Sequence, residues 1–153
     1  MRLEAPDWVN IVPITRDGLL VLVEQYRHGT DAATVEIPGG MVDPGEDPAT
    51  AAARELEEET GYRAGTLHLL GCVDPNPAFL SNRCWTYLAL ECVPDGTVQP
   101  DPSEEISLRF VPPSSFTELI DDGTIRHSLV VTAHDHLQRG IHRGAEWADA
   151  ISD

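Results

Sequence analysis

The chain has 153 residues, of which 41% are hydrophobic, and this length fits one domain with a single core over residues 1–153. Its 26 acidic residues oppose ten arginines and no lysine, and the resulting formal net charge of −16 at pH 7 argues against binding nucleic acid through a basic surface. No stretch approaches the roughly 20 apolar residues of a membrane span, so we expect no membrane insertion.

Three strands are predicted before residue 40. The N-terminus lacks the apolar core of a signal peptide, so we expect a cytoplasmic protein. The β-formers of residues 8–14 predict a first strand, and the aliphatic run of residues 19–23 predicts a buried second strand. That strand continues into the polar residues 24–29. Residues 34–38 predict a brief strand that leads to Gly39.

Residues 48–60 predict a glutamate-rich helix. Asp47 is a good N-cap residue, Pro48 suits the first helical position and Gly61 is placed to end the helix. At about 100° per residue, one side of this helix is apolar and is expected to be buried. That side consists of Ala49, Ala53, Leu56 and Thr60.

A neighbouring side of the same helix collects negative charge. Glu55, Glu58 and Glu59 fall within an arc of about 100°, where they repel one another, and the helix macrodipole disfavours anions near the C-terminus. Arg54 can reach Glu58 one turn later, but one arginine does not neutralise three carboxylates. A hard divalent cation such as Mg²⁺ would offset the repulsion. The alternative is a solvated acidic face in an acidic protein.

The second half of the chain mixes strands and helices. Residues 66–73, 83–93 and 106–111 predict strands, and residues 74–82 form a proline-containing loop. A capping box that opens at Ser115 predicts a short helix towards residue 120. The last helix is predicted over residues 126–138, and its core face is Leu129, Val130, Ala133 and Leu137. This order of elements suggests an α/β sandwich.

The cysteines and the later histidines do not suggest a metal site. The three cysteines are expected to be reduced core residues, and they are Cys72, Cys84 and Cys92. The histidines are expected to lie on the surface, and they are His127, His134 and His136.

Residues 40–62 resemble the Nudix box, which is a glycine, five residues, a glutamate, seven residues and then Arg-Glu-aliphatic-any-Glu-Glu-any-Gly-aliphatic. The matching positions are Gly40, Glu46, Arg54, Glu55, Leu56, Glu58, Glu59 and Gly61. Tyr62 departs from the aliphatic residue that the family prefers. On this stretch the chain is identified as a member of the Nudix hydrolase family. The resemblance implies an α/β fold of the Nudix type, an α/β/α sandwich with a mixed β-sheet between helices.

The resemblance also implies a Mg²⁺-dependent enzyme, with Mn²⁺ as a substitute ion. The implied metal ligands are the Gly39 carbonyl, Glu55, Glu58 and Glu59. Arg54 and Glu46 are implied to be structural residues, with Arg54 orienting Glu58 and Glu46 holding the loop.

The general base is taken from different places in this family. Glu104 and Glu105 precede a predicted strand and resemble the acidic loop of ADP-ribose pyrophosphatases, which delivers a carboxylate to the metals. Glu104 is the first candidate for the general base, Glu105 is the second and Glu58 is the third. Glu104 is also an implied metal ligand. Solvated loop acids are the alternative interpretation of the pair.

Residues 25–27 followed by residues 36–40 resemble the ADP-ribose and nucleotide-sugar branch. Arg27 offers a planar fork that suits phosphate, or it pairs with Glu24 or Glu36 at the surface. Glu36 accepts hydrogen bonds from ribose or base, or it serves only Arg27.

Three further features bear on the substrate. Trp8 is either a base-stacking residue, across a homodimer as in relatives, or a core tryptophan. Pro77 stands about where the ADP-ribose subgroup carries a proline, which makes residues 76–83 a specificity candidate and Arg83 a second phosphate contact.

The predicted function is hydrolysis of ADP-ribose or a related nucleoside diphosphate sugar to a nucleoside monophosphate and a sugar phosphate. The alternative substrates are dinucleoside polyphosphates and oxidised nucleoside triphosphates. A sensor that binds a nucleotide without cleaving it is a third hypothesis, although the intact glutamates oppose it. The predicted partners are a small-molecule substrate and a second copy of the chain in a homodimer.

Overall fold

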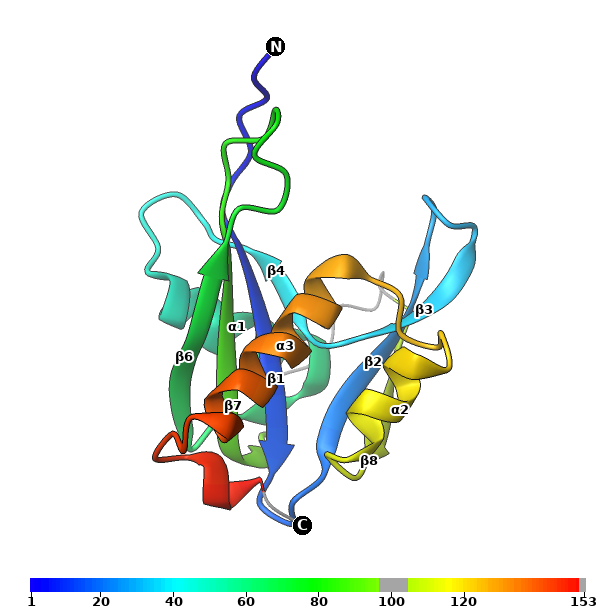
Figure 1. The fold of residues 1–153 in the computed structure, drawn as a ribbon, viewed down its shortest axis with the longest axis vertical. Coiled ribbons are helices and arrows are strands. Elements are labelled where there is room, and N and C mark those ends of the chain that lie inside the picture. Colours follow the sequence, from blue (N-terminus) through cyan, green and yellow to red (C-terminus); the bar gives the residue numbers. More distant parts are fainter. Residues whose placement is uncertain (97–104, 152–153) are drawn as a thin grey trace.

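The computed structural model describes residues 1–96 and 105–151, which form an eight-stranded mixed sheet with helices on both faces (Figure 1). The elements in chain order are β1 (Trp8–Thr15), β2 (Leu20–Arg27), β3 (Ala32–Glu36), β4 (Gly39–Met41), α1 (Pro48–Thr60), β5 (Tyr62–Arg63), β6 (Thr66–Val73), β7 (Cys84–Pro94), β8 (Ile106–Val111), α2 (Ser115–Asp121), α3 (Ser128–His142) and a 3₁₀ turn (Ala148–Ala150). The predicted α/β/α sandwich is therefore confirmed.

Strand β1 lies at the centre of the sheet. It runs parallel to β7, beginning with Trp8 beside Cys84. On its other edge it pairs antiparallel with β4 at its beginning and with β2 at its end, where Ile14 is opposite Leu20. Strand β7 also pairs with β5 and β6, and β2 also pairs with β3 and β8, all antiparallel. The beginning of β1 is thereby placed beside β4, next to the glutamate helix.

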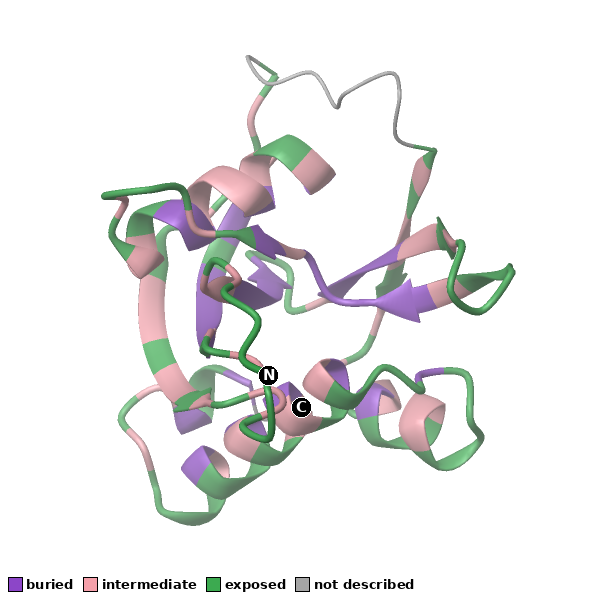
Figure 2. Cartoon of the chain, turned by 90° about the horizontal axis from the view of Figure 1, so that it is seen from above, coloured by how far each residue is buried: buried purple, intermediate pink, exposed green. Residues whose placement is uncertain are grey.

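Each face of the sheet has its own hydrophobic core (Figure 2). The core beneath α2 and α3 includes Val12, Ile14, Leu88, Leu90, Phe116, Val130 and Leu137. The core beneath α1 includes Val9, Ile11, Tyr87, Ala89, Ala52 and Leu56. Successive residues of β1 and β7 point to opposite faces, and because both faces are covered, these strands are apolar almost throughout.

Helix α1 begins and ends where the sequence predicts. The Asp47 carboxylate accepts hydrogen bonds from the backbone N–H groups of Ala49, at 3.0 Å, and Thr50, at 3.4 Å. Gly61 ends the helix in the left-handed region with φ of 71°, a conformation that glycine adopts without steric cost. The buried residues are Ala51, Ala52, Leu56 and Thr60. Of the predicted face, Leu56 and Thr60 are buried and Ala49 packs half-buried against the core, but Ala53 is only half-buried, so the prediction was wrong at Ala53.

Other local predictions were also wrong. Helix α2 has Ser114 rather than Ser115 as its N-cap, and no side chain caps it. Cys72 is exposed, whereas Cys84 and Cys92 are buried as expected. His134 and His136 of α3 are half-buried rather than on the surface. No helix among the described residues is long and apolar enough to cross a membrane.

Candidate active site

The turn at Gly39 and Gly40 lies against the second half of α1. The backbone N–H of Gly39 donates to the Glu59 carboxylate at 3.1 Å. A Cβ atom built on Gly40 would lie 2.2 Å from Cδ of Glu55. Only glycine therefore fits at residue 40 without moving that carboxylate. Two glutamates from adjacent turns of the helix thus approach consecutive residues of β4.

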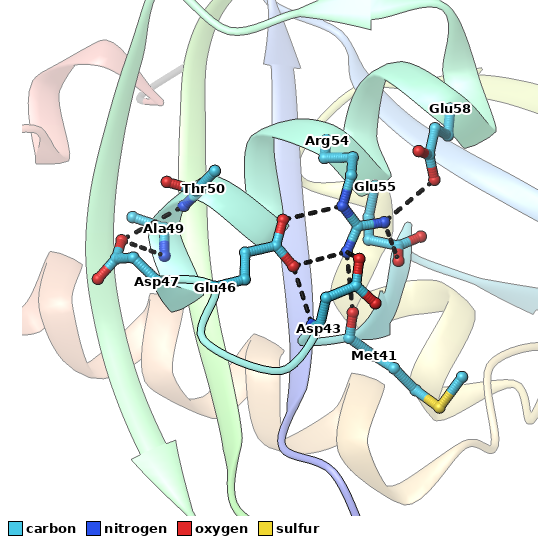
Figure 3. Close-up of polar contacts among 9 residues, drawn as sticks. All are labelled: Met41, Asp43, Glu46, Asp47, Ala49, Thr50, Arg54, Glu55 and Glu58. Atoms are coloured by element: carbon cyan, nitrogen blue, oxygen red, sulfur yellow. Dashed lines mark hydrogen bonds and ion pairs between the residues drawn. The ribbon is translucent and has the colours of Figure 1, made fainter.

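Arg54 lies between the loop before α1 and two of the helix glutamates (Figure 3). Its Nε and Nη2 donate to the two oxygens of Glu46, each at 2.9 Å. Nη1 donates to Glu55 at 2.8 Å and to Glu58 at 3.2 Å, and Nη2 also donates to the Met41 carbonyl at 3.0 Å. All five N–H groups of the guanidinium are therefore used. The predicted contact between Arg54 and Glu58 is present.

Glu46 holds the loop as well as the arginine. Its carboxylate accepts a second bond from the backbone N–H of Asp43 at 2.9 Å. The hydrogen bonds from Arg54, and then from Asp43, lower the pKa of Glu46 to about 2. The hydrogen bond to Glu46 raises the pKa of Arg54 further above its ordinary value, although burial opposes that shift. Both groups are therefore charged at neutral pH.

Glu55 and Glu59 fit a divalent cation by the chemistry of their oxygens. Mg²⁺ typically binds one or two carboxylates and completes its shell with water and substrate phosphates. Within residues 1–96 and 105–151, no group of three or more acidic, histidine or cysteine side chains is close enough to hold a metal. The Glu58 side chain is 53% exposed, beside Arg54. Glu104 lies outside the described residues.

A cavity of about 790 Å³ lies between the β2–β3 hairpin and the α2–α3 connection. Its lining includes Trp8, Arg27, Glu36, Arg126 and His127. A second cavity of about 10 Å³ shares four of these residues, all except Arg126, and its lining also includes Gly39 and Glu59. The two cavities therefore adjoin, and the small one, called the neck below, reaches Glu59 of the glutamate helix.

Arg27 and Glu36 form a bidentate ion pair at the neck. The guanidinium Nε donates to Glu36 Oε1 at 2.9 Å, and Nη2 donates to Oε2 at 2.8 Å. Thr34 adds a hydrogen bond from its hydroxyl at 2.6 Å. Burial raises the pKa of the Glu36 carboxyl, but the hydrogen bonds from Arg27 and Thr34 outweigh burial, so its pKa is lowered. Of the alternatives for Glu36, this geometry favours the support of Arg27.

Trp8 belongs to the cavity wall rather than to a core. It is half-buried at the beginning of β1, and it lines both cavities. Its indole N–H donates to the Asn10 side-chain oxygen at 2.9 Å, and the Asn10 amide in turn donates to the Leu129 carbonyl at 3.2 Å. These bonds hold the ring in the wall and link it to α3.

Two of the predicted residues lie elsewhere. Arg83 is 4.0 Å from the Asp7 carboxylate and lies over the Trp85 ring at 5.4 Å, and it lines neither of these cavities. Glu105 is exposed just before β8, whose first residue pairs with Gln25 of β2.

Arg126 and His127 are functional candidates that sequence reasoning missed. They reach the cavity because α3 packs across the sheet, which brings its N-terminal end opposite the β2–β3 hairpin (Figure 1). No local pattern in the sequence indicates this approach.

Comparisons with known proteins show what this chain is similar to. A family model described as the NUDIX domain matches residues 6–132. The ADP-ribose pyrophosphatase of Bacillus subtilis (strain 168) is 30% identical over 134 residues, which are 87% of this chain and 72% of that protein. The ADP compounds hydrolase NudE of Escherichia coli (strain K12) is 30% identical over 133 residues, 87% of this chain and 70% of that protein.

Two further similarities concern a more distant activity name and a solved structure. The methanol dehydrogenase activator of Bacillus methanolicus is 40% identical over 84 residues, so the match spans 55% of this chain but only 45% of that protein. A solved structure of an ADP compounds hydrolase superimposes with a TM-score of 0.81 at 27% identity, covering 91% of this chain and 74% of that one.

Proposed function

This chain belongs to the Nudix family of hydrolases, and we propose that it cleaves the pyrophosphate bond of ADP-ribose or a related nucleoside diphosphate sugar with the help of Mg²⁺. The products would be a nucleoside monophosphate and a sugar phosphate. The observation that carries this proposal is the cavity of about 790 Å³, which shares Arg27 and Glu36 with a small cavity lined by Gly39 and Glu59. A volume of this size suits a small-molecule ligand.

We assign the following roles in this reaction to individual residues. Glu55 and Glu59 would hold the metal beside Gly39, and Arg54 keeps Glu55 and Glu58 in place. A bound divalent ion neutralises phosphate charge and lowers the pKa of a bound water. Arg27, fixed by Glu36, would bind a phosphate oxygen, and Trp8 would contact the base or sugar in the large cavity.

The general base is proposed to be Glu104, with Glu105 and then Glu58 as the next candidates. A positioned base typically contributes 10²- to 10⁴-fold to the rate. Glu104→Gln and Glu105→Gln should be assayed separately, with the exposed Glu118→Gln of α2 as a control. We expect one of the two loop variants to lose at least about a hundredfold in kcat. If both retain near wild-type turnover, the base lies elsewhere.

A substrate panel tests the function. The purified protein is incubated with ADP-ribose, ADP-glucose, UDP-glucose, GDP-mannose, a diadenosine polyphosphate and 8-oxo-dGTP, and products are identified by mass. We expect the highest kcat/KM for a nucleoside diphosphate sugar, complete loss in EDTA and recovery with Mg²⁺ or Mn²⁺. Preferred cleavage of a dinucleotide or a triphosphate would contradict the substrate class. Binding without cleavage of any compound would favour a sensor.

The single domain over residues 1–153, the homodimer and the cytoplasmic location stay predictions. The homodimer rests on relatives that build their sites from two subunits. Sedimentation equilibrium tests it directly, and a monomer at micromolar concentration would contradict it.

A further inference from the structure

His127 has a fixed ring at the junction of the two cavities. It is the N-cap residue of α3, with an extended backbone at φ −67° and ψ 121°. Its Nδ1 accepts a hydrogen bond from the backbone N–H of Leu129 at 3.2 Å. The ring therefore satisfies one of the free backbone donors at the helix start.

This capping bond determines which nitrogen of His127 carries a proton. A ring nitrogen that accepts a hydrogen bond has no hydrogen of its own, so the neutral imidazole carries its proton on Nε2. Among residues 1–96 and 105–151, no protein group accepts a hydrogen bond from Nε2. The ring lines both the large cavity and the neck. The structure thus leaves Nε2–H available for a ligand, on a residue that lines both cavities.

The surroundings of His127 suit an anionic, oxygen-rich ligand. Arg126, the preceding residue, lines the large cavity and has no ion-pair partner within the described part of the chain, although the protein has 26 acidic residues. Arg27, which lines both cavities, already directs Nε and Nη2 to Glu36. The α2–α3 connection is therefore a second source of donors for the ligand.

We propose that His127 is a substrate-binding residue, whose Nε2–H donates to a ribose or phosphate oxygen of the nucleoside diphosphate at the neck between the cavities. This inference rests on the proposed function, because it takes the ligand to be the substrate of that reaction. It assigns the ring two tasks at once, since one nitrogen begins α3 and the other holds the substrate.

The experiment separates these two tasks. Asparagine is a good N-cap residue and its side-chain oxygen can replace Nδ1, but it has no group at the position of Nε2. His127→Asn should therefore keep the cap and lose the substrate contact, whereas His127→Ala should lose both. His142→Asn, at the other end of α3 and exposed, is the matched control. His127→Ser, which also caps, replaces His127→Asn if that variant melts early.

Three quantities are measured: Tm, Kd for ADP-ribose by calorimetry in EDTA, and KM and kcat with Mg²⁺. For His127→Asn we expect the Tm to equal that of the wild type. Kd and KM should each rise about five- to tenfold, as for one lost hydrogen bond, and kcat should stay within about twofold of the wild-type value. His127→Ala should show the same rise and a lower Tm, and His142→Asn should match the wild type.

Two failures are distinguishable. If the wild-type protein binds and cleaves ADP-ribose and stable His127→Asn does so with unchanged Kd and KM, His127 is only a helix cap and this inference is wrong. If the wild-type protein neither binds nor cleaves ADP-ribose, the proposed substrate is wrong and the inference falls with it.

Discussion

At the scale of single residues, Arg54 uses every N–H group of its guanidinium in a hydrogen bond. Its five N–H groups reach Glu46, Glu55, Glu58 and the Met41 carbonyl. Lysine has the same charge but no planar fork, so it cannot make these bonds together. Glu46 and Glu55, which are half-buried, and Glu58, which is exposed, would then lose hydrogen-bond partners.

We therefore expect Arg54→Lys to lower the free energy of unfolding and to lower kcat by more than tenfold. Urea denaturation and steady-state kinetics measure both. Arg139→Lys is the control, because its side chain is 64% exposed and pairs with Asp135 along α3. Equal stability of the two variants would contradict the role given to Arg54.

Glu46 should make the free energy of unfolding depend on pH in the acidic range. Its folded pKa of about 2 lies below the ordinary value of 4.5, so the folded state favours the charged form. The stabilisation is fully present above about pH 4.5 and is lost as pH falls towards 2. Glu46→Gln should be less stable than wild type at pH 7, and the difference should shrink below pH 4.5. A difference that is independent of pH between 7 and 3 would argue against this linkage.

At the scale of elements, the packing of β4 on α1 positions Glu55. A methyl group at residue 40 would fall 2.2 Å from Glu55 Cδ, and the Glu55 side chain is only 14% exposed. Because the carboxylate is the flexible end of its side chain, we expect it to move while the fold persists. Gly40→Ala should raise the Mg²⁺ concentration for half-maximal activity at least about tenfold with little change in Tm.

The control for Gly40→Ala is Gly96→Ala, because a Cβ atom on Gly96 meets nothing within 4 Å. Activity is titrated with Mg²⁺ for both variants. An unchanged Mg²⁺ requirement in Gly40→Ala would mean that Glu55 does not contribute to metal binding.

Sequence reasoning succeeded for elements whose signals are local. Helix α1 was predictable because Asp47, Pro48 and Gly61 mark its ends within the helix sequence itself. Strands β4 and β5 were missed because they have three and two residues and depend on pairing with β1 and β7. His136 was taken for a surface residue, but its ring packs against Gly71, beside a register shift in β6.

The candidate site was predictable only in part, for the same reason. The box residues lie within one short stretch, so their spacing could be matched to the Nudix box, and the resemblance implied their roles. The cavity wall combines β1, the β2–β3 hairpin and the α2–α3 connection, which meet only in the folded sheet. Nothing in the local sequence around Arg126 and His127 indicates that these residues reach the cavity.

At the scale of the whole molecule, the net charge of −16 is the dominant feature. Self-repulsion of this size destabilises the compact state and is screened by salt. Genome composition or a salty cytoplasm could each produce the acidic, lysine-free chain. On the hypothesis of salt adaptation, Tm should rise between low salt and molar KCl. Calorimetry at several KCl concentrations tests this, and a Tm that does not rise counts against it.

Strand β1 alternates between two kinds of surroundings at its beginning. Trp8 and Asn10 face the neck, whereas Val9 and Ile11 are fully buried in the core beneath α1. Consecutive residues of β1 thus belong in turn to the cavity wall and to the core. Heat inactivation and global melting should consequently coincide, because this part of the cavity wall and the core share one strand.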